Sequence, residues 1–188
     1  MTILAPKTKV IKSSANLTFY LLLSDGKILI TSGLINKEDQ YTTQTEIIDV
    51  SNSNSFCRSW APMPTGIEGA VGAFIGGKAI VCGGEDREKE QNACYQITEI
   101  STNYLNRLTE TRGYAAGVKV DEDTLWITGG WEEHDHERDT SDYVYSSGQV
   151  VPGPRLPKRS WGHQMVKVDD STYAMIGGAH PRGNYLIM

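Results

Sequence analysis

The sequence predicts an all-β protein built from repeated units of short antiparallel strands. Three observations carry this prediction: apolar runs that end in paired glycines, a regular spacing of these runs, and turn signals between short β-prone segments. The runs are KAIVCGG, TLWITGG and TYAMIGG, with a weaker copy, KILITSG. Their last glycines, Gly33, Gly84, Gly130 and Gly178, are separated by 51, 46 and 48 residues. A period of this size indicates a repeat architecture, in which one unit alone cannot bury its apolar face.

The last two copies align without a gap at an offset of 48 residues. Val118-Lys119-Val120 falls on Val166-Lys167-Val168, and Gly129-Gly130 falls on Gly177-Gly178. The copy ending at Gly84 fits the same frame once one residue is removed from a turn. We therefore divide the chain into an N-terminal polar segment, residues 1–17, and repeat units at approximately 18–64, 65–109, 110–157 and 158–188.

Each unit is expected to open with a hairpin. In the first unit, apolar residues 18–23 and Lys27 to Thr31 flank Asp25-Gly26. This dipeptide predicts a two-residue type I′ turn, which requires positive φ at both central positions. Gly76-Gly77 occupies the same place in the second unit, and the later units carry the longer polar turns DEDT and DDST.

A third and a fourth strand follow each polar loop after the glycines. The predicted third strands are Thr45 to Val50, Ala93 to Ile97 and Asp142 to Tyr145, and the fourth apolar positions are Trp60, Leu105 and Val150-Val151. No stretch keeps a 3.6-residue apolar period for three turns, so no helix is predicted. Each complete unit therefore reads as four short antiparallel strands.

Composition excludes several classes of protein. The 188-residue chain is 39% apolar and has a formal net charge of -5, which gives no overall attraction to nucleic acid or an anionic membrane. No apolar run approaches the ~20 residues of a membrane-spanning helix. No secretory signal is visible, so we expect a cytoplasmic protein with reduced thiols at Cys57, Cys82 and Cys94. Cys82 is expected to act as a small buried hydrophobe.

The repeats resemble the kelch repeat. The segments EGAVGAFIGGKAIVCGG and RGYAAGVKVDEDTLWITGGW carry its small residues, hairpin, apolar strand and Gly-Gly, followed by a strand near a tyrosine. The resemblance covers residues 18–188. Three departures are Ser32 in place of a first glycine, Leu105 where the first repeat has Trp60, and a fourth repeat that stops soon after its glycines.

This resemblance implies a kelch-type β-propeller, with each repeat forming one blade of four antiparallel strands around a central channel. About 3.5 blades are present, whereas kelch-like rings resemble six- or seven-bladed propellers, so we expect an incomplete or open ring. The chain could be a fragment, form an open arc or pair with another copy. It could also close as a four-bladed ring, with residues 7–12 as the last outer strand. Open edges would favour self-association.

The paired glycines are expected to be structural, because only glycine allows close backbone approach or positive φ where inner strands crowd. None of them fits a phosphate-binding pattern. The residues to which we assign a structural role are these glycines, Gly33, Gly83, Gly84, Gly129, Gly130, Gly177 and Gly178, together with Trp60.

Candidate binding residues lie on the loops after the glycines, at 34–44, 85–92 and 131–141, because a propeller presents such loops on a rigid scaffold. Two loops are acidic, EDREKE and WEEHDHERD, and basic residues mark the links into the next blades. Opposite charges on neighbouring loops could bind a charged peptide, although charged loops often only keep a protein soluble. The candidates are Arg112, Arg155, Lys158, Arg159, Glu85, Asp86, Trp131, Glu132, His134 and His136.

His134 and His136 are two residues apart, so both imidazoles could point the same way on an extended segment. They lack a fixed third ligand, and we predict no metal site. The sequence shows no nucleophile with a base, no paired carboxylates and no cofactor motif, so we predict neither cofactor nor catalysis.

The sequence therefore favours a noncatalytic module that binds a protein or peptide partner. The kelch resemblance implies part of a larger scaffold or a ubiquitin-ligase substrate adaptor. The alternatives are a propeller-based oxidase or sugar-modifying enzyme, and a truncated nonfunctional product. Stoichiometric copper in the purified protein would favour the enzyme over the noncatalytic module.

Overall fold

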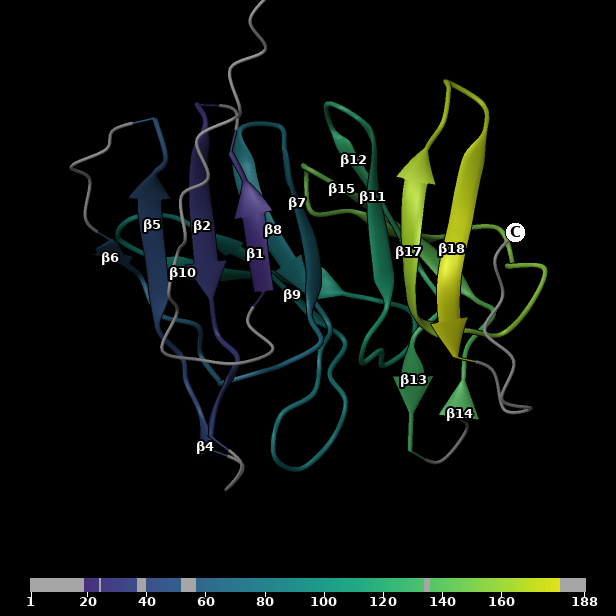
Figure 1. Cartoon of the computed structure of the whole chain (residues 1–188), viewed down its shortest axis with the longest axis horizontal. Helices are drawn as coiled ribbons and strands as arrows, with labels where there is room; N and C mark the ends of the chain where they lie inside the picture. Colours follow the sequence, from purple (N-terminus) through teal and green to yellow (C-terminus); the bar gives the residue numbers. More distant parts are fainter. Residues whose placement is uncertain (1–18, 24, 37–39, 52–56, 134–135, 180–188) are drawn as a thin grey trace, which may run out of the picture.

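The computed structural model describes residues 19–23, 25–36, 40–51, 57–133 and 136–179. These residues form eighteen β-strands, and no helix occurs among them. Three four-stranded antiparallel sheets and one two-stranded sheet follow one another along the chain and lie side by side in an arc (Figure 1). The predicted all-β class with four-stranded antiparallel units is confirmed.

Each sheet is built from strands of one repeat unit, in chain order from the inside of the arc outward. The first sheet contains β1 (Phe19–Leu22), β2 (Lys27–Thr31), β5 (Thr45–Asp49) and β6 (Arg58–Trp60). The second contains β7 (Val71–Ile75), β8 (Lys78–Cys82), β9 (Ala93–Ile97) and β10 (Thr102–Arg107). The third contains β11 (Ala116–Asp121), β12 (Thr124–Thr128), β15 (Ser141–Tyr145) and β16 (Val150–Pro152).

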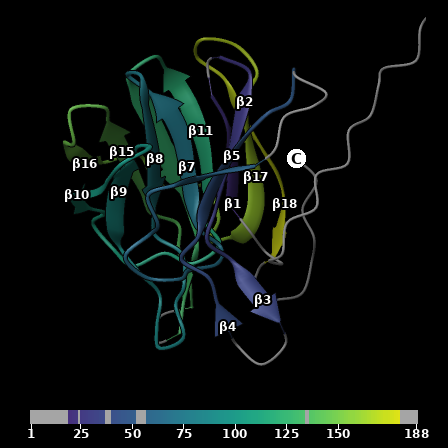
Figure 2. The same cartoon turned by 90° about the vertical axis from the view of Figure 1, so that its left-hand side faces the viewer.

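The fourth unit contributes β17 (Trp161–Lys167) and β18 (Tyr173–Ala179) to the described chain. Inner strands β1, β7, β11 and β17 contact one another in sequence along the arc. Outer strands β10 and β16 lie at the far left of the side view in Figure 2, away from β11 and β17. Residues 7–12, considered above as a further outer strand, lie outside the described residues.

Two apolar cores fill the spaces between neighbouring sheets. The first core joins Leu29 and Ile47 of the first sheet to Val81 of the second. The second core joins Ile80 to Leu125 and Val144 of the third sheet, together with others. Alternate residues of β8 therefore enter opposite cores, as the two-residue period of a strand requires. This position explains why KAIVC reads as a continuous apolar run.

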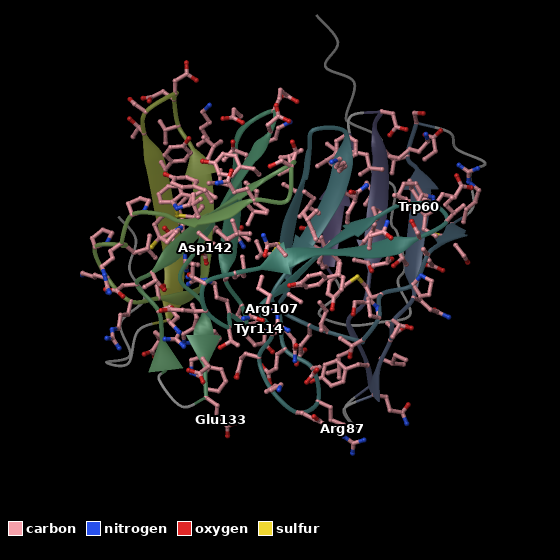
Figure 3. The ribbon with its side chains drawn as sticks, turned by 180° about the vertical axis from the view of Figure 1, so that it is seen from behind. Trp60, Arg87, Arg107, Tyr114, Glu133 and Asp142 are labelled. Carbon is pink, nitrogen blue, oxygen red and sulfur yellow. A yellow bond between two sulfur atoms is a disulfide. The ribbon has the colours of Figure 1, made fainter. Side chains whose placement is uncertain are left out.

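Trp60 lies half-buried at the end of β6, where its ring packs against the first core (Figure 3). At the two ends of the arc some apolar side chains remain exposed. They are Tyr20 and Leu22 on β1, and Val166 and Ile176 on the β17–β18 sheet. Self-association through open edges stays a prediction, and these side chains are the surface that it would use.

Backbone geometry at the glycine pairs is restrictive. Gly83 and Gly84 have φ of 63° and 93°, and a Cβ on Gly84 would lie 2.7 Å from the Glu68 carbonyl oxygen. Ser32, which departs from the repeat pattern, adopts the same left-handed region with φ of 57°. Its hydroxyl accepts a hydrogen bond from Ile67 N (2.6 Å) and donates one to Thr42 O (3.0 Å), which offsets the strain.

The predicted type I′ turn at Asp25-Gly26 is wrong. Leu23 N donates to Lys27 O (2.8 Å) and Gly26 N donates to Leu23 O (3.1 Å), so the tight turn runs from Leu23 to Gly26, and Gly26, with positive φ, ends this turn instead of lying at its centre. The hairpin itself is present, because β1 and β2 pair as expected. Gly76-Gly77 does form a two-residue turn with positive φ at both positions, between the paired residues Ile75 and Lys78.

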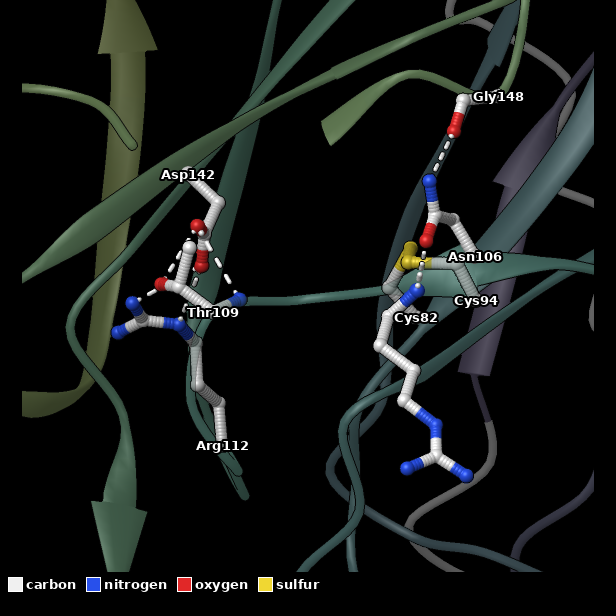
Figure 4. Close-up of a disulfide and its surroundings, with 8 residues drawn as sticks. Cys82, Cys94, Asn106, Thr109, Arg112, Asp142 and Gly148 are labelled. Atoms are coloured by element: carbon white, nitrogen blue, oxygen red, sulfur yellow. Dashed lines mark hydrogen bonds and ion pairs between the residues drawn. A yellow bond between two sulfur atoms is a disulfide. The ribbon is translucent and has the colours of Figure 1, made fainter. Parts of the chain in front are cut away.

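The expectation of reduced thiols is wrong for two of the three cysteines. Cys82 of β8 and Cys94 of β9 form a disulfide (Figure 4). They are direct cross-strand partners with Cα atoms 4.0 Å apart, and both side chains are fully buried. Directly opposed, non-hydrogen-bonded residues bring their side chains closest together in an antiparallel pair. The cytoplasmic assignment loses the support that it drew from reduced thiols.

Within the described residues, no helix has the length and apolarity needed to cross a bilayer.

Candidate binding surface at the loop end

Three long loops project from the same end of the arc, at the bottom of Figure 1. The first is the ribbon of β3 (Leu34–Asn36) and β4 (Gln40–Tyr41), and the third is the ribbon of β13 (Trp131–Glu132) and β14 (His136–Glu137). Between them lies the loop of residues 85–92. We call this end of the molecule the loop end.

Three glutamates lie side by side at the base of these loops. Isolated antiparallel bridges pair Glu68 with Glu85, and Glu85 with Glu90. Directly opposed residues of antiparallel segments place their side chains on the same face. A Cβ on Gly113 would meet Glu90 Cγ at 3.4 Å and Glu85 Oε2 at 3.7 Å, so both side chains extend over this glycine. We call Glu68, Glu85 and Glu90 the acidic ladder.

Burial sets the electrostatics of the acidic ladder. Glu68 and Glu90 are only 8% and 5% exposed, and Glu85 is half-buried. Burial, followed by the negative charges of Glu90, Glu68, Glu133 and Asp86, raises the pKa of the Glu85 carboxyl. Within the described chain, none of the three glutamates forms an ion pair with a lysine or arginine. The ladder therefore concentrates negative charge that no lysine or arginine of the described chain neutralises through an ion pair.

Two tyrosines flank Glu68. The Tyr41 hydroxyl donates to Glu68 Oε1 (3.3 Å), whereas Glu68 Oε2 is buried with no hydrogen-bond partner among the described residues. Burial, followed by the adjacent Glu68 carboxylate, raises the pKa of the Tyr114 phenol. In Figure 3, Tyr114 lies near the base of the loops that carry Arg87 and Glu133.

Tyr114 has an unusual backbone. Its φ is 53°, a region that side-chain-bearing residues rarely occupy. Gly69 and Gly162 hold the corresponding places in the neighbouring repeats, with φ of 60° and 63°. Backbone hydrogen bonds join the three positions, from Tyr114 N to Gly69 O and from Gly162 N to Tyr114 O, each 2.9 Å long. A tyrosine therefore stands where both neighbouring repeats have glycine.

Two hollows adjoin this cluster. One, of about 440 Å³, lies along the inner strands and is lined by Phe19, Gly69, Tyr114 and His163, among others. The other, of about 660 Å³, lies at the loop end and is lined by Tyr41, Asp86 and Arg87, among others. Each tyrosine thus borders a solvent-accessible space.

His163 on β17 is 2% exposed beside the first hollow. Its Nε2 shares a hydrogen bond with Thr128 Oγ1 (2.9 Å), and its Nδ1 has no partner among the described residues. Burial lowers the pKa of the imidazole to about 4, so the ring is neutral at neutral pH. His163 is therefore a packing residue of an inner strand.

The prediction that Arg112 belongs to an open binding surface is wrong. Its side chain is fully buried, and its guanidinium donates to Asp142 Oδ2 (3.0 and 3.1 Å), Gly129 O (2.8 Å) and Thr140 O (3.0 Å). Asp142 is also fully buried and accepts a hydrogen bond from the Thr109 hydroxyl (2.7 Å; Figure 4). Arg112 satisfies polar groups buried around the third sheet, so it is unavailable to a partner.

Other predicted basic residues are accessible. Arg155, Lys158 and Arg159 are exposed on the link between β16 and β17. Arg155 Nη1 pairs with Asp139 Oδ1 (2.8 Å). Leu156 N donates to Asp139 O, so this link lies against the segment that follows β14.

The structure describes the side chains of Asp86, Trp131 and Glu132 but not those of His134 and His136. Asp86 shapes its own loop, since its Oδ1 accepts from Glu88 N and Lys89 N (2.9 and 3.0 Å). Trp131 is half-buried, and Glu132 pairs with Arg138 (2.8 Å). His134 lies outside the described residues, and the structure describes only the backbone of His136. The expectation that these two histidines form no metal site therefore stays a prediction.

Sequence reasoning missed Glu68 and Tyr114, and it included Tyr41 and Glu90 only within the candidate loops 34–44 and 85–92 without singling them out. For Tyr114 a signal existed, because aligning the repeats places it over Gly69 and Gly162. For Glu68 none existed, because its pairing with Glu85 depends on a bridge between separate segments.

Comparison with known proteins yields a fold and no family. No protein-family model matches the chain, and no curated protein matches it. A solved structure titled "Structure of YjhT" is similar, with 15% sequence identity and a TM-score of 0.65 over 74% of this chain. The match covers 46% of that protein, so the chain spans less than half its length. At this identity the likeness shows the fold alone, and the chain has a β-propeller-like, all-β architecture.

Proposed function

We propose that this protein is a noncatalytic interaction module in which kelch-type blades present the loop end to a segment of another protein. The observation that carries the proposal is the projection of three long, charged loops from one end of a packed array of sheets. Rigid sheets can hold such loops in a fixed relative arrangement, which lowers the entropy cost of binding.

The charges at the loop end fit a polar, charged segment as the partner. The acidic ladder carries only negative groups, whereas Lys158 and Arg159 lie exposed on the link after β16. A peptide that crosses both regions would meet charges of both signs, which favours specificity over bulk affinity. By the kelch resemblance, we propose that the module serves a larger scaffold or a ubiquitin-ligase substrate adaptor.

Selection from a random peptide library displayed on phage tests the proposal. Enriched peptides would be synthesised, and their affinities measured by fluorescence anisotropy against the chain and two single variants. Arg159→Ala removes an exposed cation at the loop end, and Lys167→Ala removes one at the opposite end of β17. We expect Arg159→Ala to weaken binding about threefold or more and Lys167→Ala to leave it unchanged. Failure to enrich any peptide, or equal effects of the two variants, would count against binding at the loop end.

A further inference from the structure

We propose that the acidic ladder, with Tyr41 and Tyr114, is a subsite for one organic cation: the ammonium or guanidinium group of a lysine or arginine in the bound partner. The inference rests on the proposed function and specifies the chemistry that the loop end recognises.

The first argument is the placement of like charges. Backbone hydrogen bonds between Glu68 and Glu85 run in both directions, at 2.9 and 2.8 Å, and fix the two residues opposite each other. The bridge from Glu85 to Glu90 adds the third carboxylate to the same face. Directly opposed like charges destabilise a β-ladder. A cation bound between the carboxylates would remove this repulsion.

The second argument is an unsatisfied oxygen. Glu68 is more than nine-tenths buried, and its Oε2 has no hydrogen-bond partner among the described residues. Buried polar atoms are normally paired, and an unpaired carboxylate oxygen is costly. The antiparallel bridge to Glu85 places the Glu68 side chain on the face of the ladder. A ligand N–H group would complete its hydrogen bonding.

The third argument is the strained tyrosine. Tyr114 keeps a left-handed backbone where Gly69 and Gly162 serve in neighbouring repeats, so its side chain carries a conformational cost. The ring stands beside Glu68 and borders the 440 Å³ hollow. A tyrosine face next to carboxylates attracts a cation through the ring quadrupole, and a guanidinium can also stack on it.

The donor set favours an organic cation over a metal ion. Within the described residues, no three histidine, cysteine or carboxylate side chains converge closely enough to hold a metal. Spaced carboxylates beside aromatic rings instead suit a guanidinium, which pairs with two oxygens at once, or an ammonium. The two hollows border Tyr114 and Tyr41, the tyrosines beside Glu68, rather than the carboxylates themselves.

The test uses small probes that need no knowledge of the partner. Nα-acetyl-arginine amide, Nα-acetyl-lysine amide and the neutral isostere Nα-acetyl-citrulline amide would be titrated into ¹⁵N-labelled protein and followed by NMR. We expect both cationic probes to bind and to shift the Glu68, Glu85 and Tyr114 amides, and citrulline to bind at least about tenfold more weakly. Equal binding of citrulline, or Ca²⁺ binding at a lower concentration than the arginine probe, would overturn the proposal.

Matched variants locate the subsite. Glu85→Gln should weaken the arginine probe at least about tenfold, whereas Glu88→Gln, on an exposed residue of the same loop, should change its affinity less than about twofold. Glu85→Gln should also raise the melting temperature, because it removes like-charge repulsion. Equal affinities for the two variants would overturn the proposal.

Tyr114→Gly provides a second test that keeps all three carboxylates. Glycine accepts positive φ, but the variant also loses the edge-to-face contact of Tyr114 with Trp161 (ring centroids 5.9 Å apart), so circular dichroism would first verify its fold; it should then bind the arginine probe several-fold more weakly. Undiminished binding would remove the tyrosine from the subsite. If library peptides bind at the loop end but do not distinguish arginine from citrulline, the subsite is wrong and the interaction function stands. If no peptide binds there, the proposed function itself fails.

Discussion

Replacing Arg112 with methionine should strongly destabilise the protein. The substitution keeps most of the apolar stem and removes a guanidinium that lies fully buried around the third sheet. It leaves the Asp142 carboxylate without its cation, and the carbonyl oxygens of Gly129 and Thr140 without their side-chain donor. The loss falls mainly on groups that water does not reach in the folded state.

The size of the expected loss in free energy of unfolding follows from the burial of the Arg112–Asp142 pair. Breaking a buried ion pair by removing one partner costs about 3–5 kcal/mol, because the remaining charge is uncompensated. Arg155→Met is the matched control: its pair with Asp139 has a similar distance, 2.8 Å, but the Arg155 side chain is 71% exposed. Exposed pairs contribute about 0–1 kcal/mol. The two variants should therefore differ by about 2–5 kcal/mol in free energy of unfolding.

Urea unfolding followed by circular dichroism and tryptophan fluorescence measures both values. A double variant, Arg112→Met with Asp142→Asn, should recover part of the loss, since the buried carboxylate charge is gone while an acceptor for Thr109 remains. Equal losses for Arg112→Met and Arg155→Met would refute the assignment of Arg112 as a buried structural cation. A double variant no more stable than the single one would show that the unpaired charge is not the main cost.

Three further predictions concern His163, Gly84 and the disulfide. Burial lowers the folded-state pKa of His163 to about 4, so below pH 6.5 the unfolded chain takes up a proton that the folded chain does not. Lowering the pH from 7.5 to 5 should therefore reduce the free energy of unfolding by about 2 kcal/mol. His163→Gln should flatten this dependence in unfolding curves measured across that range; a parallel pH profile would argue against a neutral buried ring. Gly84→Ala should destabilise the protein by more than about 2 kcal/mol, and Gly77→Ala by about 1 kcal/mol. Both glycines have positive φ, but only at Gly84 would the added Cβ contact a backbone atom. Equal urea midpoints for the two variants would contradict this close contact. Reducing Cys82–Cys94 should release two thiols and lower the stability by about 2–4 kcal/mol, and an unchanged midpoint after mass spectrometry has verified reduction would contradict a stabilising bridge.

Periodic features of the chain were predictable because they depend on local sequence. The KAIVC run of β8, the strand at Ala93–Ile97 and the two-residue turn at Gly76-Gly77 all follow from side-chain alternation and backbone preference. At Asp25-Gly26 the local signal identified the hairpin but not the length of its loop.

Contacts between side chains on separate strands and loops were not predictable. Arg112 looked like a surface cation because its partner, Asp142, belongs to a strand 30 residues later. Cys82 looked like a lone hydrophobe because the β8–β9 register, rather than the spacing of cysteines, brings Cys94 opposite it. The candidate site had the same difficulty, since the sequence marked the acidic loop 85–92, which includes Glu85 and Glu90, but not Glu68, which pairs with it from a separate segment.

The double burial of β8 has a consequence for how the molecule opens. The second sheet has an apolar core on each face, whereas the two-stranded β17–β18 sheet leaves Val166 and Ile176 in water. In a stack whose units contact only their neighbours, protection of backbone amides should follow position along the array. Deuterium should therefore enter β17–β18 by local fraying and reach β8 and β12 only when the whole array comes apart.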